Sequence, residues 1–180
     1  MSPCAPTEIV SRPLADAPAL QPASLAAAAL LWGRLEAMWR AQGARGPAPP
    51  RALLDVGAMR DFLDLVMLVD VLRDAGASSG RSDYRFRVYG TGLAQLYGAD
   101  LTGWRVSALT SAAGTLHRRC FDAALTHGAA IRFTHDLAER AYARRVEGLC
   151  FPLTLSGATI DQLVAIEAPL GLKRAPAPYL

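Results

Sequence analysis

The chain has 180 residues, of which 52% are hydrophobic and 19% charged, with a formal net charge of +3. This length suits one domain with a substantial core, and the composition excludes general disorder. The basic residues are spread along the chain instead of gathering in one segment, so the charge does not predict a nucleic-acid partner.

The compartment follows from the cysteines and the apolar runs. The three cysteines have no CxxC spacing, which favours a reduced setting over a disulfide framework. The longest apolar run, residues 25–32, is too short to span a bilayer, and the N-terminus lacks a basic region followed by an apolar run. We therefore expect a cytoplasmic protein without a membrane segment.

The first elements in chain order are an arm and a helix. Residues 1–23 contain prolines without periodicity, which predicts a flexible arm, and strong helix formers then predict a helix over 24–42. Its wide apolar arc must cover either its own domain or a second copy of the chain. We expect a homodimer whose interface includes Leu31, Trp32, Leu35 and Trp39, with a helix that caps its own sheet as the alternative.

The middle of the chain combines strands with short helices. A short helix after Asp55 precedes the apolar run 65–72, which predicts a strand buried on both faces. The strand that follows alternates, so we expect one face to carry Tyr84, Phe86 and Val88, and the other to carry Arg85, Arg87 and Tyr89. Short helices and a longer one over 111–127 come next.

The last third returns to strands. Segments 129–137, 143–155 and 159–168 have strand patterns, with a turn at Ser156–Gly157, and residues 168–180 predict a flexible tail. Because short connections dominate, we predict an α+β fold on an antiparallel sheet, with one domain over 24–167.

The glycine turn after the alternating strand raises the possibility of a phosphate site. Gly90 and Gly92 begin a GxGxxG pattern, but Gln95 stands at its third glycine. The P-loop signature is also missing, because Lys173 is the only lysine in the chain. The turn is therefore interpreted as a tight corner between a strand and a helix.

The residues around this corner carry a family resemblance. The stretch "VYGTGLAQLYGADLTGWRVSAL", with its G-x-x-L-x-G pattern, resembles the core of PAS domains. The helix "LWGRLEAMWRAQGARGPAP" and the later strands "YARRVEGLCFPLTLSGATIDQLVAI" are similar to a family of small stand-alone bacterial PAS-like proteins. The resemblance covers residues 28–167, and its order of elements matches the order read from the pattern.

The resemblance implies a fold and a function. PAS domains have a five-stranded antiparallel sheet with short helices on one face, here with an added N-terminal helix, and they act as sensory modules. A small, largely apolar ligand would lie between helices and sheet, and the signal would pass to an unidentified signalling protein. The alternative for each candidate is a place in the ordinary core. The candidate ligand-binding residues are Phe86, Val88, Leu93, Leu96, Tyr97, Trp104, Leu109, Phe121, Ile131, Phe133 and Cys150.

The cofactor is unknown from the sequence. His117, His127 and His135 lack any further element of a haem signature, Cys120 lacks the context of flavin photosensors, and no residue set has metal-ligand spacing. We expect no enzyme activity. The alternatives are a ligand-free interaction or dimerisation module and, by fold analogy, a small isomerase or dehydratase.

Overall fold

The computed structural model describes residues 23–73, 82–110, 112–136 and 143–172. Most of the predicted arm therefore lies outside the described residues. The predicted tail is wrong in its first residues, because the last strand continues to Leu172 and buries Ala168 completely. This strand extends because it pairs with its neighbour along its whole length, as far as the Ala143–Leu172 pair.

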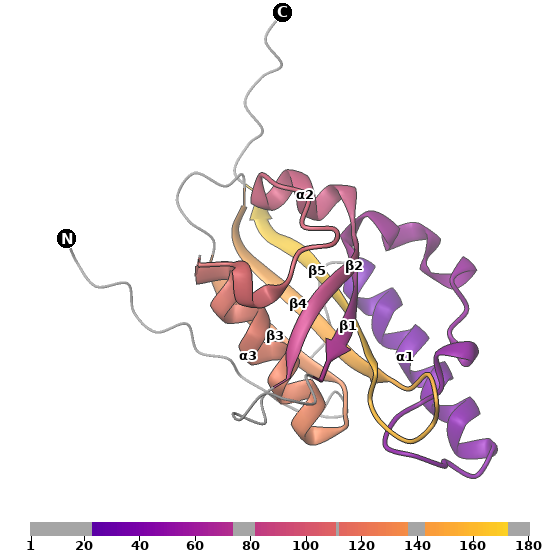
Figure 1. The fold of residues 1–180 in the computed structure, drawn as a ribbon. Helices are drawn as coiled ribbons and strands as arrows, with labels where there is room; N and C mark the ends of the chain where they lie inside the picture. The colour runs from indigo at the N-terminus through magenta and orange to yellow at the C-terminus, as the bar shows by residue number, and fades with distance from the viewer. Residues whose placement is uncertain (1–22, 74–81, 111, 137–142, 173–180) are drawn as a thin grey trace, which may run out of the picture.

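The sheet has five strands, as predicted. They are β1 (Val66–Leu72), β2 (Asp83–Tyr89), β3 (Ile131–Asp136), β4 (Ala143–Leu153) and β5 (Gln162–Leu172). Their order is β2-β1-β5-β4-β3, and every neighbouring pair is antiparallel. β5 therefore lies in the centre, between β1 of the β1–β2 pair and β4 of the β3–β4 pair (Figure 1).

Helical segments cover both faces of the sheet. Within the described residues the α-helices are α1 (Ala23–Ala41), α2 (Thr91–Tyr97) and α3 (Ala112–His127), and the 3₁₀ segments are η2 (Arg51–Leu53), η3 (Gly57–Leu65) and η4 (Val106–Ala108). α1 and η3 pack on one face, called the outer face here, whereas α2, η4 and α3 pack on the inner face (Figure 1). The order of elements agrees with the sequence prediction.

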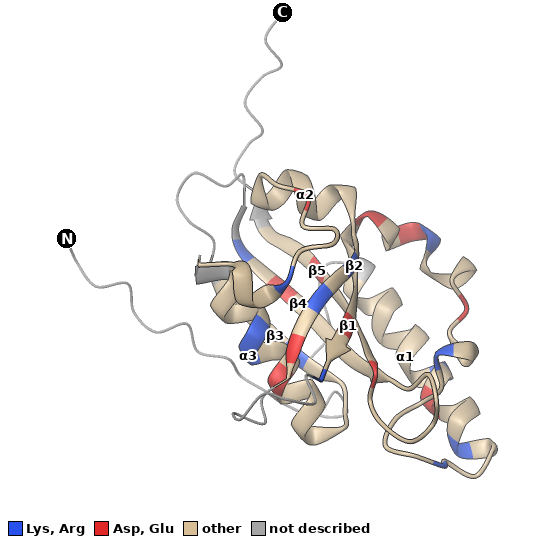
Figure 2. Cartoon of the chain, viewed as in Figure 1, with Lys and Arg blue, Asp and Glu red and all other residues tan. Residues whose placement is uncertain are grey.

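Strand alternation divides the buried residues into two cores. Successive side chains of a strand point to opposite faces, so Leu163 and Ala165 of β5 join the inner core while Val164 and Ile166 join the outer core. β1 is also buried on both faces, as its apolar run predicts. In Figure 2 the charged residues colour only scattered parts of the strands and helices, which fits an interior that is mainly apolar.

The alternation predicted for β2 is wrong at its C-terminal end. The pairing with β1 shifts register at the Leu68–Val69 step, so that β2 bulges at Arg87. Phe86 is buried as expected, but Val88 is 44% exposed and Tyr89 only 5% exposed. The bulge therefore turns Tyr89, and not Val88, toward the inner core.

α1 covers its own sheet. Leu31, Trp32 and Leu35 are buried in the outer core, and the Trp32 ring lies 5.0 Å from the ring of Phe151. Trp39 is half-buried and donates its indole N–H to a backbone carbonyl of the following loop at 3.1 Å. The expectation of a dimer interface is thus wrong for Leu31, Trp32 and Leu35, because the folded chain itself occupies their surface. Dimerisation through other residues stays a prediction.

The glycine corner is a site of close packing. A Cβ on Gly90 would stand 2.2 Å from the carbonyl oxygen of Asp64 at the end of η3, and one on Gly92 would stand 2.8 Å from the Asp64 carboxylate. Gly98 ends α2 in the left-handed conformation at φ 80°. These contacts confirm the interpretation of the turn as a tight corner.

We expect Gly90→Ala to lower the free energy of unfolding by about 1–3 kcal/mol, because backbone atoms of Asp64 cannot yield to a new methyl group. Gly33→Ala is the matched control, since nothing lies within 4 Å of its Cβ position in α1. There the change should be neutral or stabilise by up to about 1 kcal/mol. Chemical denaturation measures both, and equal effects would contradict the packing argument.

Candidate functional site

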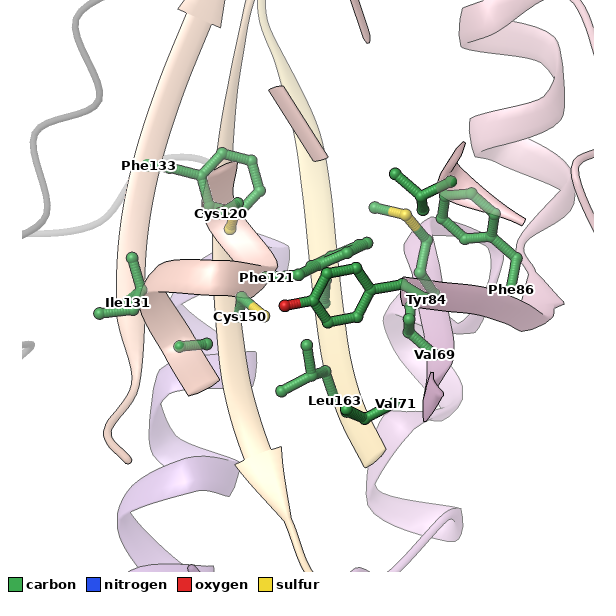
Figure 3. Packing of buried hydrophobic residues seen from close by; sticks show 14 of the residues in the cluster. Val69, Val71, Tyr84, Phe86, Cys120, Phe121, Ile131, Phe133, Cys150 and Leu163 are labelled. Atoms are coloured by element: carbon green, nitrogen blue, oxygen red, sulfur yellow. The ribbon is translucent and has the colours of Figure 1, made fainter. Parts of the chain in front are cut away.

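Most of the predicted ligand-binding residues come together on the inner face. The buried inner core contains Phe86, Leu93, Leu96, Phe121, Ile131, Phe133 and Cys150, and the partly buried Tyr97 and Leu109 pack against it. Figure 3 shows several of these side chains converging between α3 and the strands. Nine of the eleven residues predicted from the sequence therefore lie in or against one core.

Two of the predicted residues lie elsewhere. Val88 is displaced by the β-bulge, and Trp104 is 54% exposed. The segment around Trp104 runs along the free edge of β2, where Phe86 donates its N–H to the Trp104 carbonyl at 3.0 Å. The predicted place of Trp104 in the core is therefore wrong, because its backbone is held at the sheet edge while its ring faces outward.

A group of four polar residues lies within the inner core and is called the Glu167 cluster here. Glu167 is fully buried. Its Oε1 lies 3.0 Å from Nε2 of His117, and its Oε2 accepts the hydroxyl of Tyr97 and lies 3.7 Å from Nε2 of His135. The Tyr97 hydroxyl is also 2.9 Å from Nε2 of His135. The cluster therefore joins α2, α3, β3 and β5.

Strand and helix periodicity place these residues together. Glu167 follows Leu163 and Ala165 on the inward side of β5, and His135 follows Ile131 and Phe133 on the inward side of β3. His117 lies one turn before Phe121 on the buried side of α3. A charged group thus occupies a position at which the alternation would otherwise place an apolar side chain.

The histidines control the charge of the cluster. Burial by itself would raise the pKa of Glu167, but the charge and hydrogen bonds of His117 and His135 outweigh it and hold this pKa well below its usual range. Burial and the nearby Glu167 carboxylate raise the pKa of the Tyr97 hydroxyl well above its ordinary value. The cluster thus holds an ionised carboxylate beside a neutral phenol.

Two polar atoms close to this carboxylate have no hydrogen-bond partner. One is the hydroxyl of Tyr89, and the other is Nδ1 of His117. Burial, followed by the charge of Glu167, raises the pKa of Tyr89, so this hydroxyl also stays protonated. A buried polar atom without a partner costs about 1–3 kcal/mol. Thr154 Oγ1 and Gln162 Oε1 are also buried without a partner, but only the Tyr89 hydroxyl and His117 Nδ1 belong to residues near the Glu167 carboxylate.

Aromatic rings surround His117. The rings of Phe86, Tyr97 and Phe121 lie 5.6, 5.7 and 5.8 Å from its ring, and Phe121 is nearly parallel to it at 13°. The site therefore combines apolar walls with a few hydrogen-bonding groups, which is the composition of small-molecule sites in proteins.

Sequence reasoning found only part of this cluster. Tyr97 is among the candidate ligand-binding residues, whereas the sequence gives His117 and His135 no role beyond the absence of a haem signature; both histidines are buried in the core. Glu167 was missed. The one available signal was an acidic residue at an inward position of the apolar stretch "LVAIEA".

Other chemical features are sparse in the part of the chain that the structure describes. Cys120 and Cys150 are free and buried, as expected of small core residues. Among residues 23–73, 82–110, 112–136 and 143–172, no group of three or more His, Cys, Asp or Glu side chains is arranged to hold a metal ion. Of the described helices, none has both the length and the apolar character needed to cross a membrane.

Comparisons with known proteins identify one family. A family model described as a PAS domain matches residues 32–166. No curated protein and no solved structure matches the chain. The match covers most of the sequence and includes α2, α3, β1 to β4 and the first residues of β5.

We expect Glu167→Gln to lower the free energy of unfolding at neutral pH by roughly 3 kcal/mol, because it leaves the buried histidines without their carboxylate. A carboxyl whose pKa is lowered by folding contributes stability above its unfolded pKa of about 4.3 and loses it as the pH falls below that value. The parent should therefore lose stability in acid more steeply than the variant, as measured by denaturation at several pH values.

Glu36→Gln is the control for this change. Glu36 pairs with Arg40 one turn along α1 at the surface, so its replacement should cost no more than about 0.5 kcal/mol. If the two variants lose equal stability, the Glu167 cluster does not support the fold in the manner argued above.

Proposed function

Because the chain belongs to the PAS-domain family, whose members are sensory and regulatory modules, we propose that it binds a small, largely apolar molecule on the inner side of the sheet. The ligand lies among the inner-core side chains and contacts the Glu167 cluster. The resulting change passes to a protein partner. The observation that carries this proposal is the pair of buried, unpartnered atoms, the Tyr89 hydroxyl and His117 Nδ1.

The Glu167 cluster connects the proposed ligand site to two helices. Tyr97 belongs to α2 and His117 to α3, and both contact the carboxylate of Glu167 on β5. A molecule that competes for or completes these hydrogen bonds changes how firmly the two helices are held on the sheet. A ligand shifts a conformational equilibrium when it binds one conformation more tightly than the other, and a contact that depends on the position of the helices meets this condition.

Native mass spectrometry and an absorption spectrum of the freshly purified protein test the proposal. We expect a mass above that of the bare chain, and absorption in the visible region would further identify a chromophoric ligand. A bare mass in every preparation, together with no binding of added apolar compounds, would contradict ligand binding.

A matched pair of variants locates the bound molecule. Ala165 and Ala168 are both fully buried on β5, the first in the inner core and the second in the outer core. Replacement by Leu should cost about 1–3 kcal/mol at either position through overpacking. We expect only Ala165→Leu to remove the retained mass. Loss of the mass in both variants would show that general destabilisation is responsible.

A second candidate function is that of a dimerisation module, and the exposed side of α1 favours it. Leu30 is 66% and Met38 43% exposed on the side of the helix that faces away from the sheet. Large apolar residues in such a position are typical of contact surfaces when they form a contiguous patch.

Leu30→Glu and Trp32→Glu separate dimerisation from folding. If α1 forms a dimer, Leu30→Glu should yield a monomer of unchanged stability, measured by light scattering and thermal unfolding. Trp32→Glu buries a charge against Phe151 and should destabilise the fold by roughly 3–5 kcal/mol. A parent protein that is monomeric at all concentrations would exclude this second function.

A further inference from the structure

We propose that the unpartnered Nδ1 of His117 in the Glu167 cluster and the unpartnered hydroxyl of Tyr89 in the inner core bind the neutral hydroxyl group of an alcohol or phenol, whose apolar body lies among the inner-core side chains. This inference rests on the proposed ligand-binding function and adds the chemical class of the ligand. It starts from the protons that the described hydrogen bonds require.

The hydrogen bonds assign a proton to each imidazole. An ionised carboxylate only accepts, so Nε2 of His117, 3.0 Å from Oε1 of Glu167, carries a hydrogen. Tyr97 has a single hydroxyl proton and gives it to Oε2 of Glu167. Its oxygen therefore accepts from His135, whose Nε2 at 2.9 Å also carries a hydrogen.

This assignment defines what the open positions require. Nδ1 of His117 accepts a hydrogen bond when the ring is neutral and donates one when the ring is charged. The Tyr89 hydroxyl donates or accepts in either case. A hydroxyl group on a ligand also does both, so it matches these two positions in either protonation state of His117.

Charged head groups fit less well. A ligand carboxylate would bring a second negative charge close to Glu167, which is fully buried. A ligand ammonium would have to give up its water in a fully buried region, where the Glu167 carboxylate already has hydrogen bonds from Tyr97 and His117. A neutral group avoids both costs and adds no buried charge.

The neighbours of the two open positions suit an apolar body. The rings of Tyr89 and His117 both pack edge-on against Phe86, with centroids 5.3 and 5.6 Å from its own. Leu93 and Leu96 of α2 belong to the same buried core. A molecule anchored by its hydroxyl would therefore have aromatic and aliphatic side chains around its remaining atoms.

Three probes that share one chain and differ in the head group test the inference. The protein, labelled with ¹⁵N, is titrated at neutral pH with 1-octanol, octanoate and octylammonium, and amide chemical shifts give the affinity. We expect saturable binding of 1-octanol, with shifts in α2, α3 and β5, and at least several-fold weaker binding of the two ions.

Two tyrosine variants locate the head group. Tyr89→Phe removes an unpartnered hydroxyl, so it should weaken 1-octanol binding about three- to ten-fold without lowering the unfolding temperature. Tyr84→Phe is the control, because the Tyr84 hydroxyl already donates to Asp122 at 2.5 Å. It should lower the unfolding temperature and leave the affinity for 1-octanol unchanged.

The outcomes separate this inference from the proposed function. Octanoate or octylammonium bound as tightly as 1-octanol would overturn the hydroxyl class while still supporting a ligand site. Unchanged 1-octanol affinity in Tyr89→Phe would overturn the assigned position. If none of the three probes binds, the inference fails, and the mass of the purified protein then decides the proposed function independently.

Discussion

The burial of Glu167 is the constraint on which the inner half of the structure depends. A carboxylate without solvent contact costs several kcal/mol unless charged and hydrogen-bonding partners surround it. Those partners come from three other elements, through Tyr97 of α2, His117 of α3 and His135 of β3. Because the carboxylate must be satisfied, the two helices have one defined position on the sheet, which an apolar core alone would specify less strictly.

The outer half of the structure follows a different principle. Here β4 and β5 contribute Leu149, Phe151, Val164 and Ile166 to the apolar core under α1, and the contact between Trp32 and Phe151 is typical of this core. The central strand β5 therefore separates two environments along one stretch of sequence. Its outward residues secure a helix by apolar packing, while its inward residues end in a charged cluster. Substitutions on the outer side act on stability, whereas substitutions on the inner side also act on the chemistry of the candidate site.

The fold could be predicted well from the sequence, because the hydrophobic periodicity of each helix and strand and the order of these elements can be read locally along the chain. The errors arise where tertiary contacts decide. The β-bulge at Arg87 reverses the faces of Val88 and Tyr89, and no pattern within β2 announces it. The apolar arc of α1 fits a neighbouring molecule as well as its own sheet, so the sequence left both open. Glu167 was missed because its partners lie 32 to 70 positions away in the chain, beyond any local motif.

The unpartnered atoms next to Glu167 connect this architecture to sensing. In a core whose polar groups all have partners, a ligand can form a hydrogen bond only by breaking an existing one. In a core with unpartnered polar atoms, the ligand's hydrogen bond lowers the free energy without such a loss. Tyr89 lies in the inner core because the bulge turns it inward, and His117 has one ring nitrogen bound to Glu167 while the other has no hydrogen-bond partner. The Glu167 carboxylate, which holds α2 and α3 on the sheet, thus lies near the Tyr89 hydroxyl and His117 Nδ1, the two groups proposed to bind a ligand. Under the proposed function, Glu167 would therefore link ligand binding to the attachment of the two helices.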